Sequence, residues 1–154
     1  MQVRQFDSLK DYSDVSTWWK KQDWPVLPLS MLTTSGFIVE NDENKLAATW
    51  VFKTNCPVYI MEWTVGNPDV KWEDRQEAIK MLTSSASEWA KKNGASYIMT
   101  MTKSERFMDK LQEYGFTKIS DITTNKYGEI ITALKLLDQK TKIEAKKEGE
   151  NGLF

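Results

Sequence analysis

The sequence predicts an α/β fold, and three patterns indicate it. A strand, a turn, a helix, a strand and a second helix follow one another over residues 58–116. Two short strand-like runs at 36–40 and 45–53 flank the polar turn 41–44, which is typical of a hairpin. A helical pattern begins at Ser8 or Asp7 and continues to about Gln22.

The central segment is the most informative part of the chain. Residues 58–65 are rich in β-branched and aromatic side chains and predict a buried strand that ends at the turn 66–69, where Pro68 lacks an amide donor. The helix that follows has one apolar face and ends at Asn93-Gly94. That face consists of Ala78, Ile79, Leu82, Ala86, Trp89 and Ala90, and we expect Trp89 to be core.

A second strand at 95–102 and a second helix at 104–114 complete this segment. Thr102 and Glu105 have the spacing of a capping box, and Gly115-Phe116 is typical of a helix end. The resulting βαβ unit requires a parallel second strand or one reached by a right-handed crossover. It exposes helix amides where the first strand ends, which is the usual place for an anion or a pyrophosphate.

The flanking segments supply further elements of the sheet. Residues 2–6 predict an edge strand, and 117–123 and 130–136 predict the last two strands. The apolar positions of the first helix are Leu9, Tyr12, Val15, Trp18 and Trp19. The two tryptophans are interpreted as packing residues, with a ligand platform as the alternative.

Length and composition limit the possible functions. The 154 residues are 40% hydrophobic, enough for one domain with its own core. There is no histidine and one cysteine, Cys56, so we expect no zinc site, no Ser-His or Cys-His nucleophile and no internal disulfide. The net charge of −1 argues against nucleic acid, and the absence of an apolar run long enough to span a bilayer predicts a cytoplasmic protein.

The order of these elements resembles the GNAT family of acyl-CoA-dependent N-acetyltransferases. The resemblance covers residues 1–137 and is closest to GNAT-like proteins of tailed bacteriophages, in which stretches similar to LPLSMLTTSGFIVE, MEWTVGNPD and DRQEA recur. It implies a mixed, mostly antiparallel central sheet flanked by helices. It also implies acetyl-CoA as cofactor, in a host cytoplasm or associated with a virion.

The resemblance implies cofactor contacts at Val65, Arg75, Gln76 and Ala78, with the pyrophosphate over the amides of about 72–78. In the family's phosphate loop, an Arg or Gln is followed by two small residues. Glu73, Gln76 and Ala78 occupy those three positions here, so only Ala78 matches. Glu73 and Asp74 suit a helix start but repel a pyrophosphate, and Arg75 with Lys71 is expected to compensate.

The resemblance also locates the catalytic groups. The family's tyrosine acid and the asparagine before it fall at Leu111 and Ser104, so the usual acid is missing and Tyr114 is the substitute. Glu62 is the only acid in the strand 58–65 and is the candidate base, because burial would raise its pKa. The alternative is a carboxylate that faces solvent or pairs with a Lys or Arg.

Two surface segments complete the hypotheses. By the resemblance, Trp24, Val26, Leu27 and Met31 shape an acceptor pocket, or else form a lid packed on the sheet. Residues 138–154 form a charged tail that ends in Leu153-Phe154, which we expect to bind another protein chain. The sequence thus favours an N-acetyltransferase with a degenerate phosphate loop, with a catalytically silent binding or virion-assembly protein as the alternative.

Overall fold

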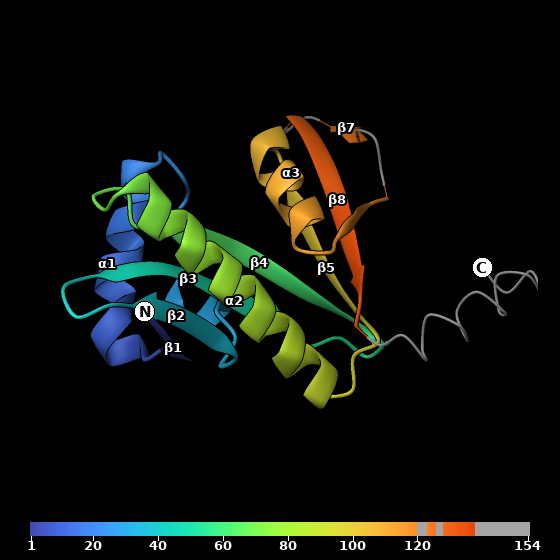
Figure 1. Ribbon diagram of the computed structural model, residues 1–154, viewed down its shortest axis with the longest axis horizontal. Helices are drawn as coiled ribbons and strands as arrows, with labels where there is room; N and C mark the ends of the chain where they lie inside the picture. Colours follow the sequence, from blue (N-terminus) through green and yellow to red (C-terminus); the bar gives the residue numbers. More distant parts are fainter. Residues whose placement is uncertain (120–122, 126–127, 138–154) are drawn as a thin grey trace, which may run out of the picture. The chain divides into compact units, whose positions relative to one another are not determined.

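The computed structural model describes residues 1–119, 123–125 and 128–137, so the expected tail at 138–154 lies outside the described residues. Contacts divide the chain into two compact units (Figure 1). The first contains Met1–Phe52 and Met61–Ala86, and the second contains Lys53–Ile60 and Ser87–Phe154. Strand β4 (Val58–Gly66) and helix α2 (Trp72–Lys92) each contribute residues to both units. The expectation of one domain over 1–137 stays a prediction.

The first unit is built on a sheet in the order β1-β2-β3-β4. Strands β1 (Gln2–Gln5), β2 (Gly36–Glu40) and β3 (Lys45–Phe52) pair antiparallel, which confirms the predicted edge strand and hairpin. Asn41 closes the hairpin, since its side-chain oxygen accepts from the amides of Glu43 and Asn44 at 3.0 and 2.7 Å.

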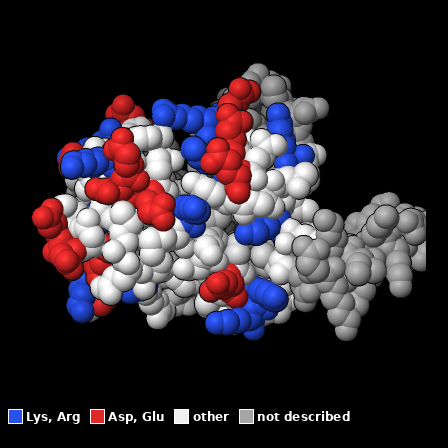
Figure 2. All heavy atoms as spheres, viewed as in Figure 1, with Lys and Arg blue, Asp and Glu red and all other residues white. Residues whose placement is uncertain are grey.

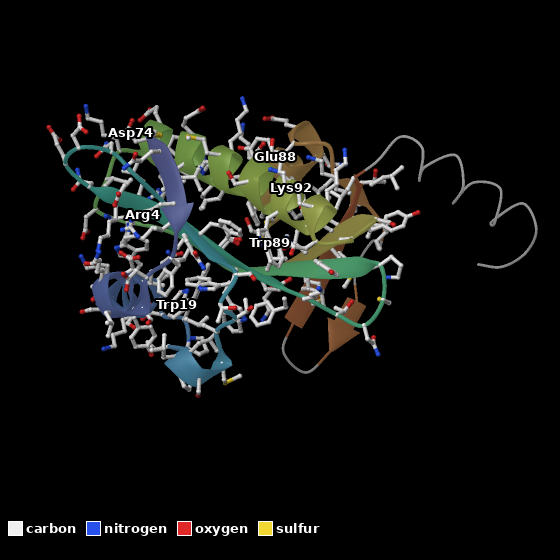
Figure 3. The ribbon with its side chains drawn as sticks, turned by 90° about the horizontal axis from the view of Figure 1, so that it is seen from below. Arg4, Trp19, Asp74, Glu88, Trp89 and Lys92 are labelled. Carbon is white, nitrogen blue, oxygen red and sulfur yellow. The ribbon has the colours of Figure 1, made fainter. Side chains whose placement is uncertain are left out.

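Helix α1 (Ser8–Lys21) covers one face of this sheet. It begins as predicted, because the Asp7 carboxylate caps the Leu9 amide at 3.0 Å. Trp19 is fully buried between α1 and the strands, 5.6 Å from the Trp50 ring (Figure 3), so the packing interpretation is confirmed. Leu9 was wrongly assigned to the apolar face, since it is 96% exposed.

The first part of α2 covers the opposite face of the same sheet. Its side chains Ala78 and Leu82 are fully buried and form a core cluster with Val39, Leu46 and Ala47 of the hairpin. The predicted spacing of three and four residues therefore places the correct face of α2 on the sheet.

The second unit contains the start of β4, then β5 (Tyr97–Thr102), β8 (Gly128–Leu136) and β6 (Thr117–Lys118) in sheet order, with β7 (Thr123–Asn125) on β8. The β4–β5 pair is parallel, with Val58 opposite Tyr97, as one form of the predicted βαβ unit requires. The β5–β8 and β6–β8 pairs are antiparallel. The fold is therefore α/β with a mixed, mostly antiparallel sheet, as expected.

Two predicted details of the second unit are wrong. Helix α3 (Glu105–Glu113) is capped by Ser104, whose hydroxyl accepts from the Phe107 amide at 3.1 Å, and not by a box from Thr102. The Thr102 hydroxyl instead accepts from the Ser104 amide at 3.0 Å. Trp89 is half-buried, with its ring 6.2 Å from that of Tyr59, so it borders the core without lying inside it.

A buried carboxylate joins α1 to three strands of the first unit. Asp11 is fully buried and accepts two hydrogen bonds from Arg4 of β1, at 2.7 and 2.8 Å. Lys45 of β3 lies 3.0 Å from the same carboxylate, and Arg4 also pairs with Glu40 of β2 at 3.0 Å. Burial alone would raise the pKa of Asp11, but the bonds from Arg4, the Asp7 amide and Lys45 together hold it well below its usual range.

Asp11→Asn is expected to lower the free energy of unfolding by about 3 kcal/mol, because it leaves Arg4 and Lys45 without their buried counter-charge. Urea titration measures this loss.

Since the folded pKa of Asp11 lies below its unfolded value of about 4, the contribution of Asp11 to stability is present above that pH and is lost as the pH falls. The wild type should therefore lose more stability than Asp11→Asn between neutral pH and pH ~3; equal losses would contradict this role.

Candidate functional site

The turn that joins β4 to α2 is fixed to the start of β3. The Asn67 amide donates to Leu46 O at 2.8 Å, and its side-chain nitrogen donates to Lys45 O at 2.8 Å. Its side-chain oxygen accepts from the Asp69 amide at 2.9 Å, and Asp69 forms an ion pair with Lys21 of α1. These contacts set the direction in which the chain enters α2.

Arg75 lies across this turn. A Cβ added at Gly66 would lie 2.3 Å from Arg75 Cδ and 2.5 Å from its Cγ, so only glycine leaves room for the arginine stem. The guanidinium donates to Asn67 O at 3.1 Å and lies 5.4 Å from the centre of the Trp72 ring. The structure thus brings Arg75 to Gly66 and Asn67 at the end of β4, whereas the buried side chain of Val65 packs in the core cluster beneath α1.

The start of α2 determines which amides an anion can reach. The helix begins at Trp72, and the Arg75 amide already donates to Lys71 O at 3.1 Å. The first-turn amides of residues 73 and 74 therefore have no acceptor inside the helix, whereas those of Gln76 and Ala78 lie in the second turn, where they donate four residues back. Gln76 is half-buried, and the Ala78 methyl is fully buried in the core rather than facing the turn.

Acidic side chains also surround this helix start. Glu73 and Asp74 occupy the first turn of α2, and Figure 2 shows acidic groups over this part of the helix. They stabilise the helix dipole but oppose an anionic ligand. Arg75 lies at the side of the same turn, and its expected role in compensating for these acids stays a prediction.

Glu62, the candidate base, is half-buried in the middle of β4, immediately before a strained residue. Trp63 has a φ of 62°, a left-handed conformation that is a genuine outlier for a bulky side chain and interrupts the pleat of β4. The ring of Trp63 packs 6.4 Å from that of Trp19, and the next residue, Thr64, bonds to Thr49 at 2.7 Å. The ring contact with Trp19 and the neighbouring Thr64–Thr49 bond therefore hold the strained backbone of Trp63 beside Glu62.

The candidate acid Tyr114 lies in the second unit. It is half-buried and forms the C-terminal cap of α3, where its amide donates to Lys110 O at 3.1 Å. Leu111, at the position of the family's tyrosine, is fully buried and packs as core. The second unit therefore has an apolar core residue where the resemblance implies an acid.

The loop that was expected to shape an acceptor pocket divides into two kinds of residue. Leu27 is buried in the core beneath α1 and Val26 packs against it, as the lid interpretation expects. Trp24 and Met31 are 42% and 59% exposed. Among the residues that the structure describes, no cluster of three His, Cys, Asp or Glu could hold a metal ion, and no helix is long and apolar enough to cross a bilayer.

No family model matches the chain, and neither does any curated protein sequence. Solved structures do match. The aminoglycoside 6'-N-acetyltransferase of Enterococcus faecium has a TM-score of 0.70 at 9% identity, over 90% of this chain and 98% of that one. The ribosomal-protein-S18-alanine N-acetyltransferase of Escherichia coli has a TM-score of 0.70 at 11% identity, over 90% and 94%. The chain has the GNAT fold.

Two other similar structures contain coenzyme A or acetyl-CoA. An aminoglycoside 6'-N-acetyltransferase complexed with coenzyme A has a TM-score of 0.69 at 11% identity, over 90% of this chain and 98% of that one. A putative acetyltransferase of Salmonella typhimurium with acetyl-CoA has a TM-score of 0.69 at 10% identity, over 90% and 94%. At these identities, the likeness establishes the fold, and the site depends on this chain's own residues.

The sequence did not indicate two features of the site. Gly66 was interpreted only as part of a turn, because the need for space arises from Arg75, nine positions later and on a different element. The left-handed backbone of Trp63 also had no sequence signal, since Gly and Asn are the residues that usually mark such a conformation.

Gly66→Ala is expected to lower the free energy of unfolding by about 1 kcal/mol, because the new methyl displaces Arg75 from Asn67 O and from the Trp72 ring. In an Arg75→Ala background, the same substitution should cost less than about 0.5 kcal/mol. A double-mutant cycle in urea measures the coupling. Additive effects of the two substitutions would show that Gly66 is not reserved for the arginine stem.

Proposed function

We propose that the chain is an acyl-CoA-dependent N-acetyltransferase that holds the cofactor's diphosphate at the β4–α2 turn. The arginine at this turn is the observation that carries the proposal. Its guanidinium lies at the end of β4, and its planar donors suit phosphate oxygens. The fold supports the assignment, because two similar structures contain coenzyme A or acetyl-CoA.

The residues at this turn suit a diphosphate through their positive charge rather than through a glycine-rich loop. The amides of residues 73 and 74 and the guanidinium of Arg75 supply donors, and exposed Lys71 adds a positive charge. Glu73 and Asp74 oppose the anion, so the contribution of Arg75 must be large for binding to occur. The Ala78 methyl is excluded from direct contact by its place in the core.

Glu62 is the residue that accepts a proton in this proposal. The bound cofactor supplies an acyl thioester whose carbonyl carbon is open to attack by an amine. That amine must first lose a proton, and a half-buried carboxylate on β4 is the group that takes it, directly or through water. The strained backbone at Trp63 supports a functional role for this part of β4.

The alternative function is a GNAT-fold protein without catalysis that binds another molecule, such as a component of a virion. The fully buried Leu111 favours it, because a core leucine cannot protonate a leaving thiolate. Half-buried Tyr114 at the end of α3 is the acid that catalysis would require in its place. Binding of acetyl-CoA separates the two functions.

Arg75→Ala is expected to weaken binding of acetyl-CoA about tenfold, because it removes charge-assisted hydrogen bonds to the diphosphate. Isothermal titration calorimetry measures this change. Pantetheine, which lacks the diphosphate, should bind both forms equally, and Arg106→Ala, at an exposed arginine of α3, is the matched control. No binding of acetyl-CoA by the wild type would reject the enzyme in favour of the silent protein.

Glu62→Gln is expected to lower kcat about 100-fold, because the amide cannot accept the proton of the amine. The dissociation constant for acetyl-CoA should stay unchanged. Thiol release from acetyl-CoA in the presence of a panel of primary amines measures the rate, with Glu88→Gln on the exposed side of α2 as control. An unchanged kcat for an accepted amine would remove Glu62 from the mechanism.

A further inference from the structure

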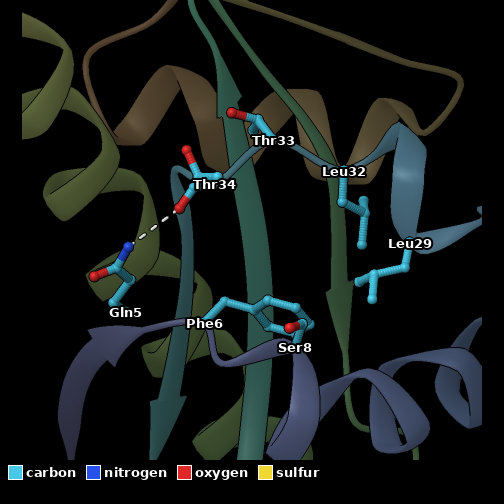
Figure 4. Close-up of a pocket in the computed structure, with 7 residues that line it drawn as sticks. All are labelled: Gln5, Phe6, Ser8, Leu29, Leu32, Thr33 and Thr34. Atoms are coloured by element: carbon cyan, nitrogen blue, oxygen red, sulfur yellow. Dashed lines mark hydrogen bonds between the residues drawn. The ribbon is translucent and has the colours of Figure 1, made fainter.

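A pocket of about 290 Å³ opens in the first unit beside the start of α1. Gln5, Phe6 and Ser8 form one side of it, and Leu29, Leu32, Thr33 and Thr34 form the other, so it separates the β1–α1 connection from the chain that leads into β2 (Figure 4). Its volume is at the lower limit for small-molecule sites.

The pocket lies away from the proposed cofactor site. It adjoins the end of β1 and the approach to β2, because Phe6 follows β1 and its amide donates to Gly36 O at 2.8 Å. The turn at Asn67 is fixed instead to Leu46, at the start of β3, beside the end of β2. The two features thus lie at opposite ends of the same sheet, so a ligand in the pocket would bind separately from the cofactor's diphosphate.

The chemistry of the lining restricts what the pocket can hold. None of its seven side chains carries a charge, so a charged ligand would lose hydration without gaining a counter-ion from the lining. Phe6, Leu29 and Leu32 supply apolar contacts, and the Ser8, Thr33 and Thr34 hydroxyls can both donate and accept. The Gln5 side-chain nitrogen donates to Thr34 O at 3.2 Å, and its oxygen points away from the other lining side chains (Figure 4).

The geometry points to a binding site for a small uncharged molecule that carries an aliphatic group and an amide. The aliphatic part packs on Phe6 and the two leucines, while the amide bonds to the hydroxyls of Ser8, Thr33 and Thr34. This ligand does not depend on acyl transfer, because neither Arg75 nor Glu62 contributes to the lining.

Phe6 also gives the site a spectroscopic reporter. Its ring contacts the fully buried indole of Trp50 edge to face, at 5.0 Å between centroids. Among the described residues, the Trp50 Nε1–H has no hydrogen-bond acceptor, so its NMR signal depends on the rings around it. A ligand against Phe6 should shift that signal and leave the indole signal of Trp72, at the start of α2, unchanged.

The test uses the whole chain and three matched probes: N-acetyl-L-leucinamide is neutral, N-acetyl-L-leucine is an anion and L-leucinamide is a cation. The neutral probe should bind with a Kd on the order of 1 mM, typical of a ligand of about a dozen heavy atoms. It should shift the amides of Gln5, Phe6, Thr33 and Thr34 together with the Trp50 indole. The charged probes should bind at least about tenfold more weakly.

Leu29→Trp should abolish these shifts by filling the pocket, whereas Leu9→Trp, at a leucine that is 96% exposed, should not. Ser8→Ala, which keeps the pocket open and removes one hydroxyl, should weaken binding about threefold and guards against a folding defect in the filled variant. The proposal would be overturned if the charged probes bound as tightly as the neutral one, or if the shifts mapped to other residues. It would also be overturned if the neutral probe gave no saturable shift at about ten times the expected Kd.

Discussion

The buried carboxylate of Asp11 is the interaction on which the first unit depends. It joins α1 to Arg4 of β1 and Lys45 of β3, and Arg4 extends the cluster to Glu40 of β2. A fully buried charge is tolerated only when its partners are fixed, so the three strands and the helix must keep their register together. The apolar packing of Trp19 beneath the same helix has no such directional requirement.

This constraint extends to the candidate site through β3. Lys45, which pairs with Asp11, also provides the backbone oxygen that holds the Asn67 side chain. Asn67 in turn provides the oxygen that accepts from Arg75. The position of the guanidinium therefore depends on a series of hydrogen bonds that begins in the charge cluster, so a substitution at Asp11 or Lys45 should disturb the site as well as the stability.

Sequence patterns were sufficient for the fold because local signals and burial agree over most of the chain. The spacing of Ala78 and Leu82 was predicted correctly, and so was a helix start at Ser8 or Asp7, of which Asp7 is the cap, since each follows from one element alone. The burial of Leu9 and Trp89 was predicted wrongly, because their exposure depends on which neighbours cover the helix ends. The site was less predictable for the same reason: the space at Gly66 belongs to a side chain on another element.

Under the proposed function, the start of helix α2 determines how a chain without the glycine pattern holds a diphosphate. Helix α2 begins at Trp72, so the positions where the family has small residues lie in its second turn and cannot offer their amides. A loop of amides binds an anion through many weak dipoles, whereas one guanidinium does so through a full charge. In the proposed site, the stem of Arg75 needs the space that glycine leaves at position 66. The affinity for the diphosphate then depends on one side chain, which a single substitution can remove.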